Sequence, residues 1–183
     1  WVQAREHLNA AIRYAENAPY LLYKRALSSF HVGDTYEAIA DTGRILKTES
    51  DHLLALELRG NCYYVLNELD MAMNHYRQAL KFDPEHKGTK EGYRLVKKIQ
   101  GLLKKVDTAN DNKEYEVAIK HLTTIIGIDP EHQFLVPVCQ VKLCDAHKEL
   151  KQFDEAKASI QKAIDYDAAH GRVNWSYHLN LGR

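Results

Sequence analysis

The chain has 183 residues, enough for one compact domain or one stretch of a repeat array with a buried interior. Lysine plus arginine and aspartate plus glutamate each number 25, so the formal net charge is zero, which disfavours a nucleic-acid binder because such proteins usually carry a basic excess. Glycine (9) and proline (4) are scarce, which favours an all-α fold, and no apolar run approaches the roughly 20 residues that membrane insertion requires.

A small residue recurs along the chain in steps of 34, 34, 46 and 38 residues. The residues concerned are Ala4, Ala38, Ala72, Ala118 and Ala156. This is the pattern of the tetratricopeptide repeat (TPR), in which a small side chain lets helices A and B of each pair cross closely. The predicted fold class is therefore an all-α TPR solenoid of antiparallel helix pairs.

The repeat pattern divides the chain into consecutive segments. Residues 1–18 are predicted to be helix B of a truncated repeat, 19–52 and 53–86 complete repeats, 87–132 a repeat with an extended helix A, 133–170 a further repeat, and 171–183 the start of another helix. The clearest of them is 53–86, whose characteristic positions are Leu56, Gly60, Tyr63, Ala72, Tyr76 and Pro84.

The third repeat is longer than the others because 12 extra residues precede its helix A, in 87–98. These residues include no proline, and apolar side chains recur at helical spacing from Tyr93 to Val106. We therefore predict one continuous helix over about 87–110 that joins two lobes.

The concave surface of a TPR array is made by the A helices. In 19–52 and 53–86 its predicted positions are unusually apolar, and exposed apolar surface of this kind often marks a binding site. The predicted client-binding groove consists of Tyr20, Tyr23, Leu27, Phe30, Leu54, Leu58, Asn61 and Tyr64. An alternative is that several of these side chains pack against neighbouring helices instead. The equivalent face of the fourth repeat is mostly charged.

The predicted long helix also carries a basic face. Its main members are Lys97, Lys98, Lys104 and Lys105. Such a face could bind an acidic partner, although a solvated helix surface is the commoner explanation of a run of like charges.

No catalytic or metal-binding motif accompanies the repeats. The histidines form no HExxH pair, there is no glycine-rich phosphate loop or nucleophile elbow, and Cys62, Cys139 and Cys144 form no CxxC pair. We therefore expect a protein that is not an enzyme, holds no cofactor or metal, and buries its cysteines as small apolar residues.

The segment from Asp83 to Lys98, DPEHKGTKEGYRLVKK, supplies a more specific resemblance. Its D-x-x-H-K ending runs into Y-x-x-V-K-K without a break, and in this respect the chain resembles the DnaJ homologue subfamily C member 3 family. These are TPR and J-domain co-chaperones of the endoplasmic reticulum (ER) lumen that also inhibit eIF2α kinases. The resemblance covers nearly the whole chain and corresponds to the family's TPR region.

The resemblance implies separate roles for the TPR lobes and the J domain of the family. The family holds misfolded or unfolded polypeptides on its TPR lobes and passes them to the ER Hsp70 through the J domain. The His-Pro-Asp motif of a J domain is missing from this sequence, so this segment is expected to hold clients without stimulating the Hsp70. The lysine–asparagine clamp with which other TPR proteins bind Hsp70 and Hsp90 is also missing. Two alternatives remain: a scaffold that docks a folded partner such as an eIF2α kinase, and a cytoplasmic adaptor of another TPR class.

Overall fold

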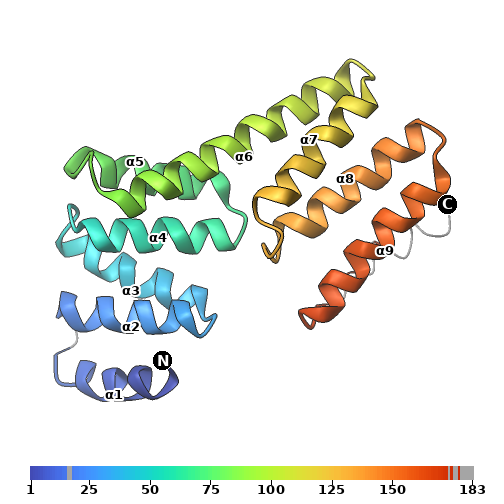
Figure 1. The fold of residues 1–183 in the computed structure, drawn as a ribbon. Helices are drawn as coiled ribbons and strands as arrows, with labels where there is room; N and C mark the ends of the chain where they lie inside the picture. Colours follow the sequence, from blue (N-terminus) through green and yellow to red (C-terminus); the bar gives the residue numbers. More distant parts are fainter. Residues whose placement is uncertain (16–17, 173, 175–176, 178–183) are drawn as a thin grey trace. The chain divides into compact units, whose positions relative to one another are not determined.

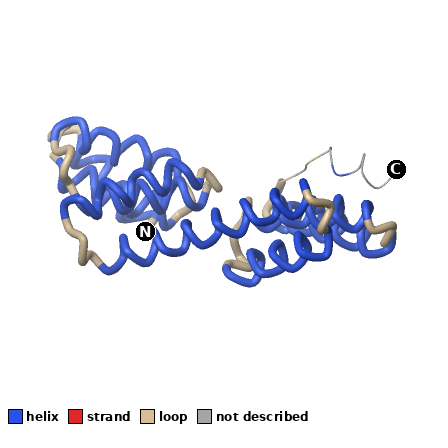
Figure 2. The backbone as a smooth tube through the Cα atoms, turned by 90° about the horizontal axis from the view of Figure 1, so that it is seen from above, coloured by secondary structure: helices blue, strands red, loops and turns tan. Residues whose placement is uncertain are grey.

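The computed structural model describes residues 1–15, 18–172, 174 and 177, and this part of the chain contains helices and no strand (Figures 1 and 2). The all-α fold predicted from the sequence is therefore confirmed. The chain forms two compact units, Trp1–Lys97 and Lys98–Arg183. The helix predicted to begin within 171–183 falls mostly on residues outside the described part.

Unit 1 is a stack of antiparallel helices (Figure 1). They are α1 (Val2–Ile12), α2 (Pro19–His31), α3 (Thr35–Thr48), α4 (Leu53–Val65), α5 (Leu69–Phe82) and the first part of α6 (Lys87–Asp111). Each of the helices α1 to α5 packs against the next in the chain, and α2 also contacts α4 directly. The helix pairs α2–α3 and α4–α5 lie in the segments where the sequence predicted complete repeats.

The turns between paired helices repeat the spacing seen in the sequence. Gly33, Asn67, Lys113 and Lys151 each have a positive φ, between 60° and 85°. They are separated by 34, 46 and 38 residues, the same steps as the alanines. Because left-handed backbone is uncommon outside glycine and asparagine, its recurrence at one position of every pair shows that the four turns are structurally equivalent.

The interior of unit 1 contains small and aliphatic residues, among them the repeat alanine Ala38. Leu22, Ala26, Ala38 and Ile45 are each at most 1% exposed. They form two apolar clusters between α1, α2, α3 and α4. Burial of this apolar surface provides most of the free energy that holds the helices together.

A buried tyrosine determines how closely α4, α5 and α6 approach one another. Tyr76 of α5 is 1% exposed. A Cβ atom at Gly60 of α4 would lie 2.6 Å from its ring, and one at Gly92 of α6 would lie 2.7 Å from it. The sequence predicted the close helix crossing at Gly60, whereas the same role of Gly92 was not recognised.

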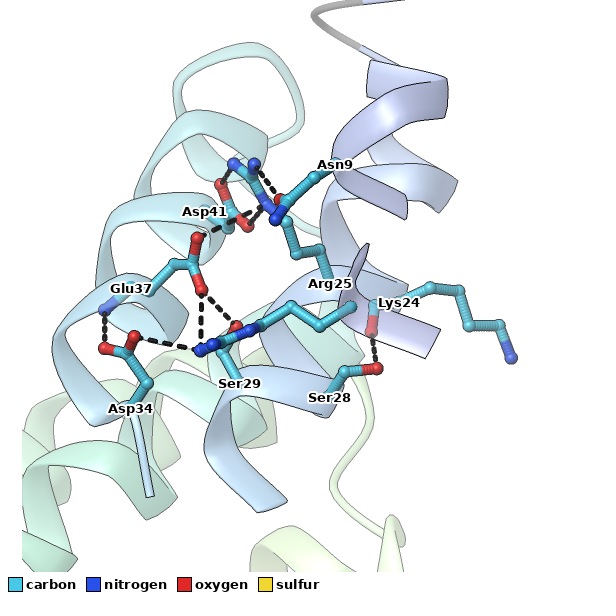
Figure 3. A network of polar contacts seen from close by, with 9 residues as sticks. Asn9, Lys24, Arg25, Ser28, Ser29, Asp34, Glu37 and Asp41 are labelled. Carbon is cyan, nitrogen blue, oxygen red and sulfur yellow. Dashed lines mark hydrogen bonds and ion pairs between the residues drawn. The ribbon is translucent and has the colours of Figure 1, made fainter. Parts of the chain in front are cut away.

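A network of polar contacts joins α1, α2 and α3 (Figure 3). The guanidinium of Arg25 donates to both carboxylate oxygens of Asp41, at 2.7 and 2.6 Å, and to Asn9 Oδ1 at 2.9 Å. The hydroxyl of Ser29 donates to Glu37 Oε2 at 2.6 Å. Arg5 of α1 lies 3.1 Å from Asp34, whose side chain also accepts a hydrogen bond from the amide of Glu37 and so caps α3.

Unit 2 contains the remainder of α6, followed by α7 (Tyr115–Ile128), α8 (Leu135–Glu149) and α9 (Phe153–Ala169). Helix α8 packs against both α7 and α9. The cluster between α8 and α9 contains Cys144, Ala156, Ile160 and Ala163.

Among the described residues, no helix combines the length and apolarity needed to cross a membrane, and no group of side chains is arranged to hold a metal ion. The three cysteines are free and buried, which confirms their predicted packing role. Burial raises the pKa of the Cys62 and Cys139 thiols to about 12, so both are protonated at neutral pH.

Candidate functional site

The predicted groove residues of unit 1 lie on α2 and α4, the two A helices that contact each other. On α2, the spacing of Tyr20, Tyr23, Leu27 and Phe30 places them along one side of the helix. Tyr20 is 68% exposed, and the other three are half-buried, with one edge against the α2–α4 cluster and the other facing solvent.

Helix α4 contributes a mixture of apolar and polar side chains to the same surface. Leu54 is 41% exposed, whereas Asn61 and Tyr64 are half-buried. We call the surface formed by Tyr20, Tyr23, Leu27, Phe30, Leu54, Asn61 and Tyr64 the α2–α4 apolar face.

One predicted member does not lie at the surface. Leu58 is 4% exposed and packs in the cluster that includes Ala26, Ala38 and Cys62. The physical reason is the direct contact between α2 and α4, which covers this position of the repeat. For Leu58, the alternative of packing against a neighbouring helix therefore holds.

Asn61 is held by a hydrogen bond from inside the protein. The hydroxyl of the buried Tyr76 donates to Asn61 Oδ1 at 2.7 Å. The carbonyl oxygen of the side chain is thus engaged, and the amide NH₂ group is the part of the side chain that can donate hydrogen bonds. Burial raises the pKa of Tyr76, so the phenol remains a donor at physiological pH.

The carboxylate of Glu57 lies on α4 between Leu54 and Asn61. The side chain of Glu57, one turn from Leu54 and one turn from Asn61, is 18% exposed. Its Oε2 atom is 3.9 Å from His86 Nδ1, and burial is the main cause of a raised Glu57 pKa. Glu57 was not predicted as a site residue, because nothing in the sequence showed that its carboxylate would be largely buried.

The predicted basic residues Lys97, Lys98, Lys104 and Lys105 are all exposed on α6. The Nζ atom of Lys97 lies 5.7 Å from the centroid of the Tyr93 ring. Lys97 belongs to unit 1 and the other three belong to unit 2.

The corresponding surface of unit 2 is polar. A pocket there is lined by Asn110, Tyr115, Lys142, Asp145, Ala146 and Glu149. Lys142 Nζ lies 3.4 Å from Asp107, so part of the charge is compensated internally. Val138 of α8 is also 41% exposed, whereas the α2–α4 apolar face of unit 1 combines the exposed Tyr20 and Leu54 with several half-buried apolar side chains.

Comparison with known proteins agrees with this geometry. Family models of the tetratricopeptide repeat match residues 54–86 and 139–170. The crystal structure of the P58(IPK) TPR domain superposes on 86% of this chain, and on 44% of that chain, with a TM-score of 0.78 at 20% sequence identity. The fold and the repeats together define the chain as a tetratricopeptide repeat protein.

Proteins similar to this chain in sequence identify the family of TPR proteins to which it belongs. The DnaJ protein P58IPK homolog of Arabidopsis thaliana is 37% identical over 134 residues, which cover 72% of this chain and 27% of that protein. DnaJ homolog subfamily C member 3 of Gallus gallus is 24% identical over 124 residues, covering 68% of this chain and 25% of that protein. The chain is a homologue of the P58IPK and DnaJ subfamily C member 3 proteins, as the segment Asp83 to Lys98 indicated. It spans about a quarter of the length of these relatives.

Proposed function

We propose that this chain is the non-catalytic TPR module of a DnaJ-type co-chaperone, and that the α2–α4 apolar face holds unfolded or misfolded polypeptide. Segments of unfolded chains expose the apolar side chains that folded proteins bury, so an apolar surface bordered by polar groups is complementary to them. Asn61 could in addition donate hydrogen bonds to main-chain carbonyl groups of such a segment.

The exposure of Tyr20 and Leu54 is the observation that carries this proposal. They are 68% and 41% exposed, next to three further apolar side chains that are only half-buried. A tyrosine offers a large contact area at a small cost in conformational entropy, which is why it is frequent at binding hot spots.

The proposal can be tested with a permanently unfolded protein, reduced and carboxymethylated lactalbumin, whose binding is followed by fluorescence anisotropy. The double variant Tyr20→Ser/Leu54→Ser is expected to weaken binding by about tenfold, because it removes two exposed apolar contacts and leaves the core unchanged.

The chain offers a closely matched control for this experiment. Tyr36 and Met71, on the B helices α3 and α5, are 74% and 41% exposed. The variant Tyr36→Ser/Met71→Ser should bind the unfolded protein as the unmodified chain does. Equal losses in the two double variants would contradict the assignment of binding to the α2–α4 apolar face.

The compartment and the partner chaperone belong to the same proposal. By homology to the P58IPK-type proteins, the module acts in the ER lumen and delivers its clients to the ER Hsp70 through a J domain. Co-fractionation of the endogenous full-length protein with markers of the ER lumen is the expected result, and exclusive recovery in the cytoplasm would contradict it.

A second candidate function is the docking of a folded partner such as an eIF2α kinase. It is favoured by the exposure of Lys98, Lys104 and Lys105 on α6. Binding through these charges should weaken steeply as salt is added and be lost when they are changed to glutamate. Binding that is indifferent to both changes would exclude this function.

A further inference from the structure

Glu57 occupies a central place on the α2–α4 apolar face. Its neighbours one turn away along α4 are Leu54 and Asn61. The pKa of Tyr23 on α2 is raised mainly by burial and secondarily by the charge of Glu57. A carboxylate is therefore surrounded by the same side chains that we propose to contact unfolded polypeptide.

The carboxylate has no lysine or arginine partner among the described residues. Its ion-pair partner there is the imidazole of His86, whose Nδ1 atom lies 3.9 Å from Oε2 and which carries a charge only when protonated. The neighbouring cation on α2, Lys24, lies instead over the ring of Tyr20, 5.4 Å from its centroid. A charge that is largely removed from water and left without a hydrogen-bonded counter-charge is costly, which is why buried carboxylates are usually paired.

The start of α6 does not satisfy this carboxylate either. Glu57 Oε1 packs against Gly88, and a Cβ atom added at Gly88 would overlap with it. The carboxylate therefore lies close to the N-terminus of α6, where the helix dipole favours a negative charge. Two amides of the first turn nevertheless have acceptors elsewhere. Those of Thr89 and Lys90 donate to His86, to its Nδ1 atom and its carbonyl oxygen respectively. Burial is the main cause of the raised pKa of Glu57, and the charge of His86 acts in the opposite direction.

We propose that Glu57 determines the specificity of the α2–α4 apolar face, which takes segments of unfolded polypeptide in which a lysine or arginine lies next to apolar side chains. The ammonium or guanidinium group of such a segment supplies the permanent counter-charge that the described residues do not provide. The long aliphatic stem of the same side chain packs on the apolar surface around Tyr23 and Leu54. This inference rests on the proposed function and adds to it the chemistry of the preferred client segment.

Two short fluorescein-labelled peptides test the inference in binding experiments with the whole chain. Both have a centre flanked by leucine and phenylalanine, and the central residue is lysine in one and glutamine in the other. The unmodified chain should bind the lysine peptide about fivefold to tenfold more tightly, as expected for one partly desolvated charge pair.

Variants of Glu57 separate its charge from its size. Glu57→Gln should bring the affinity ratio of the two peptides to about 1, with the glutamine peptide bound as before. Glu57→Lys should favour a third peptide that carries glutamate at its centre. The matched control is Glu68→Gln, which removes an exposed carboxylate that makes no capping hydrogen bond at the start of α5 and should leave the ratio unchanged.

The outcomes distinguish this inference from the function on which it rests. Equal binding of the lysine and glutamine peptides by the unmodified chain, or an unchanged ratio in Glu57→Gln, would overturn the role of Glu57 while leaving polypeptide binding intact. Failure to bind either peptide or the unfolded lactalbumin would overturn the proposed function itself. The comparison of peptides on the unmodified chain decides the matter even if a Glu57 variant does not fold.

Discussion

Tyr76 connects the interior of the repeat with the α2–α4 apolar face. Its ring occupies the space left by Gly60 and Gly92, and its hydroxyl holds the carbonyl oxygen of Asn61. One buried residue therefore sets both the distance between three helices and the orientation of an amide on the α2–α4 apolar face.

His75, the residue before Tyr76, makes the stability of the protein depend on pH. Its ring stacks on that of Tyr63, with centroids 5.3 Å apart, and its Nδ1 atom is buried without a hydrogen-bond partner among the described residues. Burial, and secondarily the charge of Arg59, lowers the pKa of His75 to about 4. An imidazole in an unfolded chain has a pKa of about 6.5, so the folded state binds fewer protons between these values.

The stability contributed by neutral His75 is thus fully present above about pH 6.5 and is lost as the pH falls towards 4. Between pH 7.5 and pH 5 we expect a loss of about 1 kcal/mol, a figure reduced to allow for the partial exposure of the ring. Urea denaturation at the two pH values measures it. The variant His75→Phe, which keeps the stacking on Tyr63, should lose that much less stability on acidification.

Exposed His7, replaced by phenylalanine, is the control for this prediction. His7→Phe should show the same acid-induced loss as the unmodified chain. A His75→Phe variant that is as sensitive to acid as the unmodified chain would refute the assignment.

The repeat spacing predicted the burial of Ala38, Ala72, Ala118 and Ala156, whereas Ala4, the first of the recurring small residues, is exposed. Leu58 shows where this reasoning ends: its repeat position assigned it to the groove, and only the contact between α2 and α4 decides that it is covered. Glu57 was missed for a related reason. Its burial depends on His86 and Gly88 at the start of α6, some 30 residues further along the chain.

At the scale of helices, the long α6 was the most predictable element. A helix over about 87–110 follows from helical spacing of apolar residues without an intervening proline, and α6 extends over Lys87–Asp111. The polar contacts of α1 could not be predicted in this way. Besides the apolar packing of Ile12, α1 is held by the polar network around Arg25, and no periodicity in the sequence relates Asn9, Arg25 and Asp41.

This network should make the α1–α3 end of unit 1 sensitive to single substitutions. Arg25 pairs with both oxygens of Asp41, which is 1% exposed. Arg25→Met leaves that carboxylate buried without its partner and is expected to cost about 3 kcal/mol in the free energy of unfolding. Chemical denaturation followed by circular dichroism measures the loss.

The double variant Arg25→Met/Asp41→Leu provides the control for this prediction. It removes both charges together, so it should be less destabilised than Arg25→Met alone. Strictly additive losses from the two substitutions would show that the pair does not act as a unit.

At the scale of the whole molecule, the two units present different surfaces to a ligand. Unit 1 exposes the α2–α4 apolar face with Glu57 among apolar groups, whereas the corresponding pocket of unit 2 is lined mainly by polar and charged side chains. The repeats are alike in fold, and their difference lies in the residues that the A helices expose. We therefore expect unfolded polypeptide to contact unit 1 in preference to unit 2.

Site-specific photo-crosslinking tests this central claim most directly. A photoreactive benzoyl-phenylalanine is placed at Tyr20 on the α2–α4 apolar face, at Tyr36 on α3, or at Tyr115 beside the polar pocket of unit 2, and each protein is irradiated with unfolded lactalbumin. The account predicts crosslinks from position 20 and few from positions 36 and 115. Crosslinks that are as abundant from position 36 or position 115 as from position 20 would contradict it.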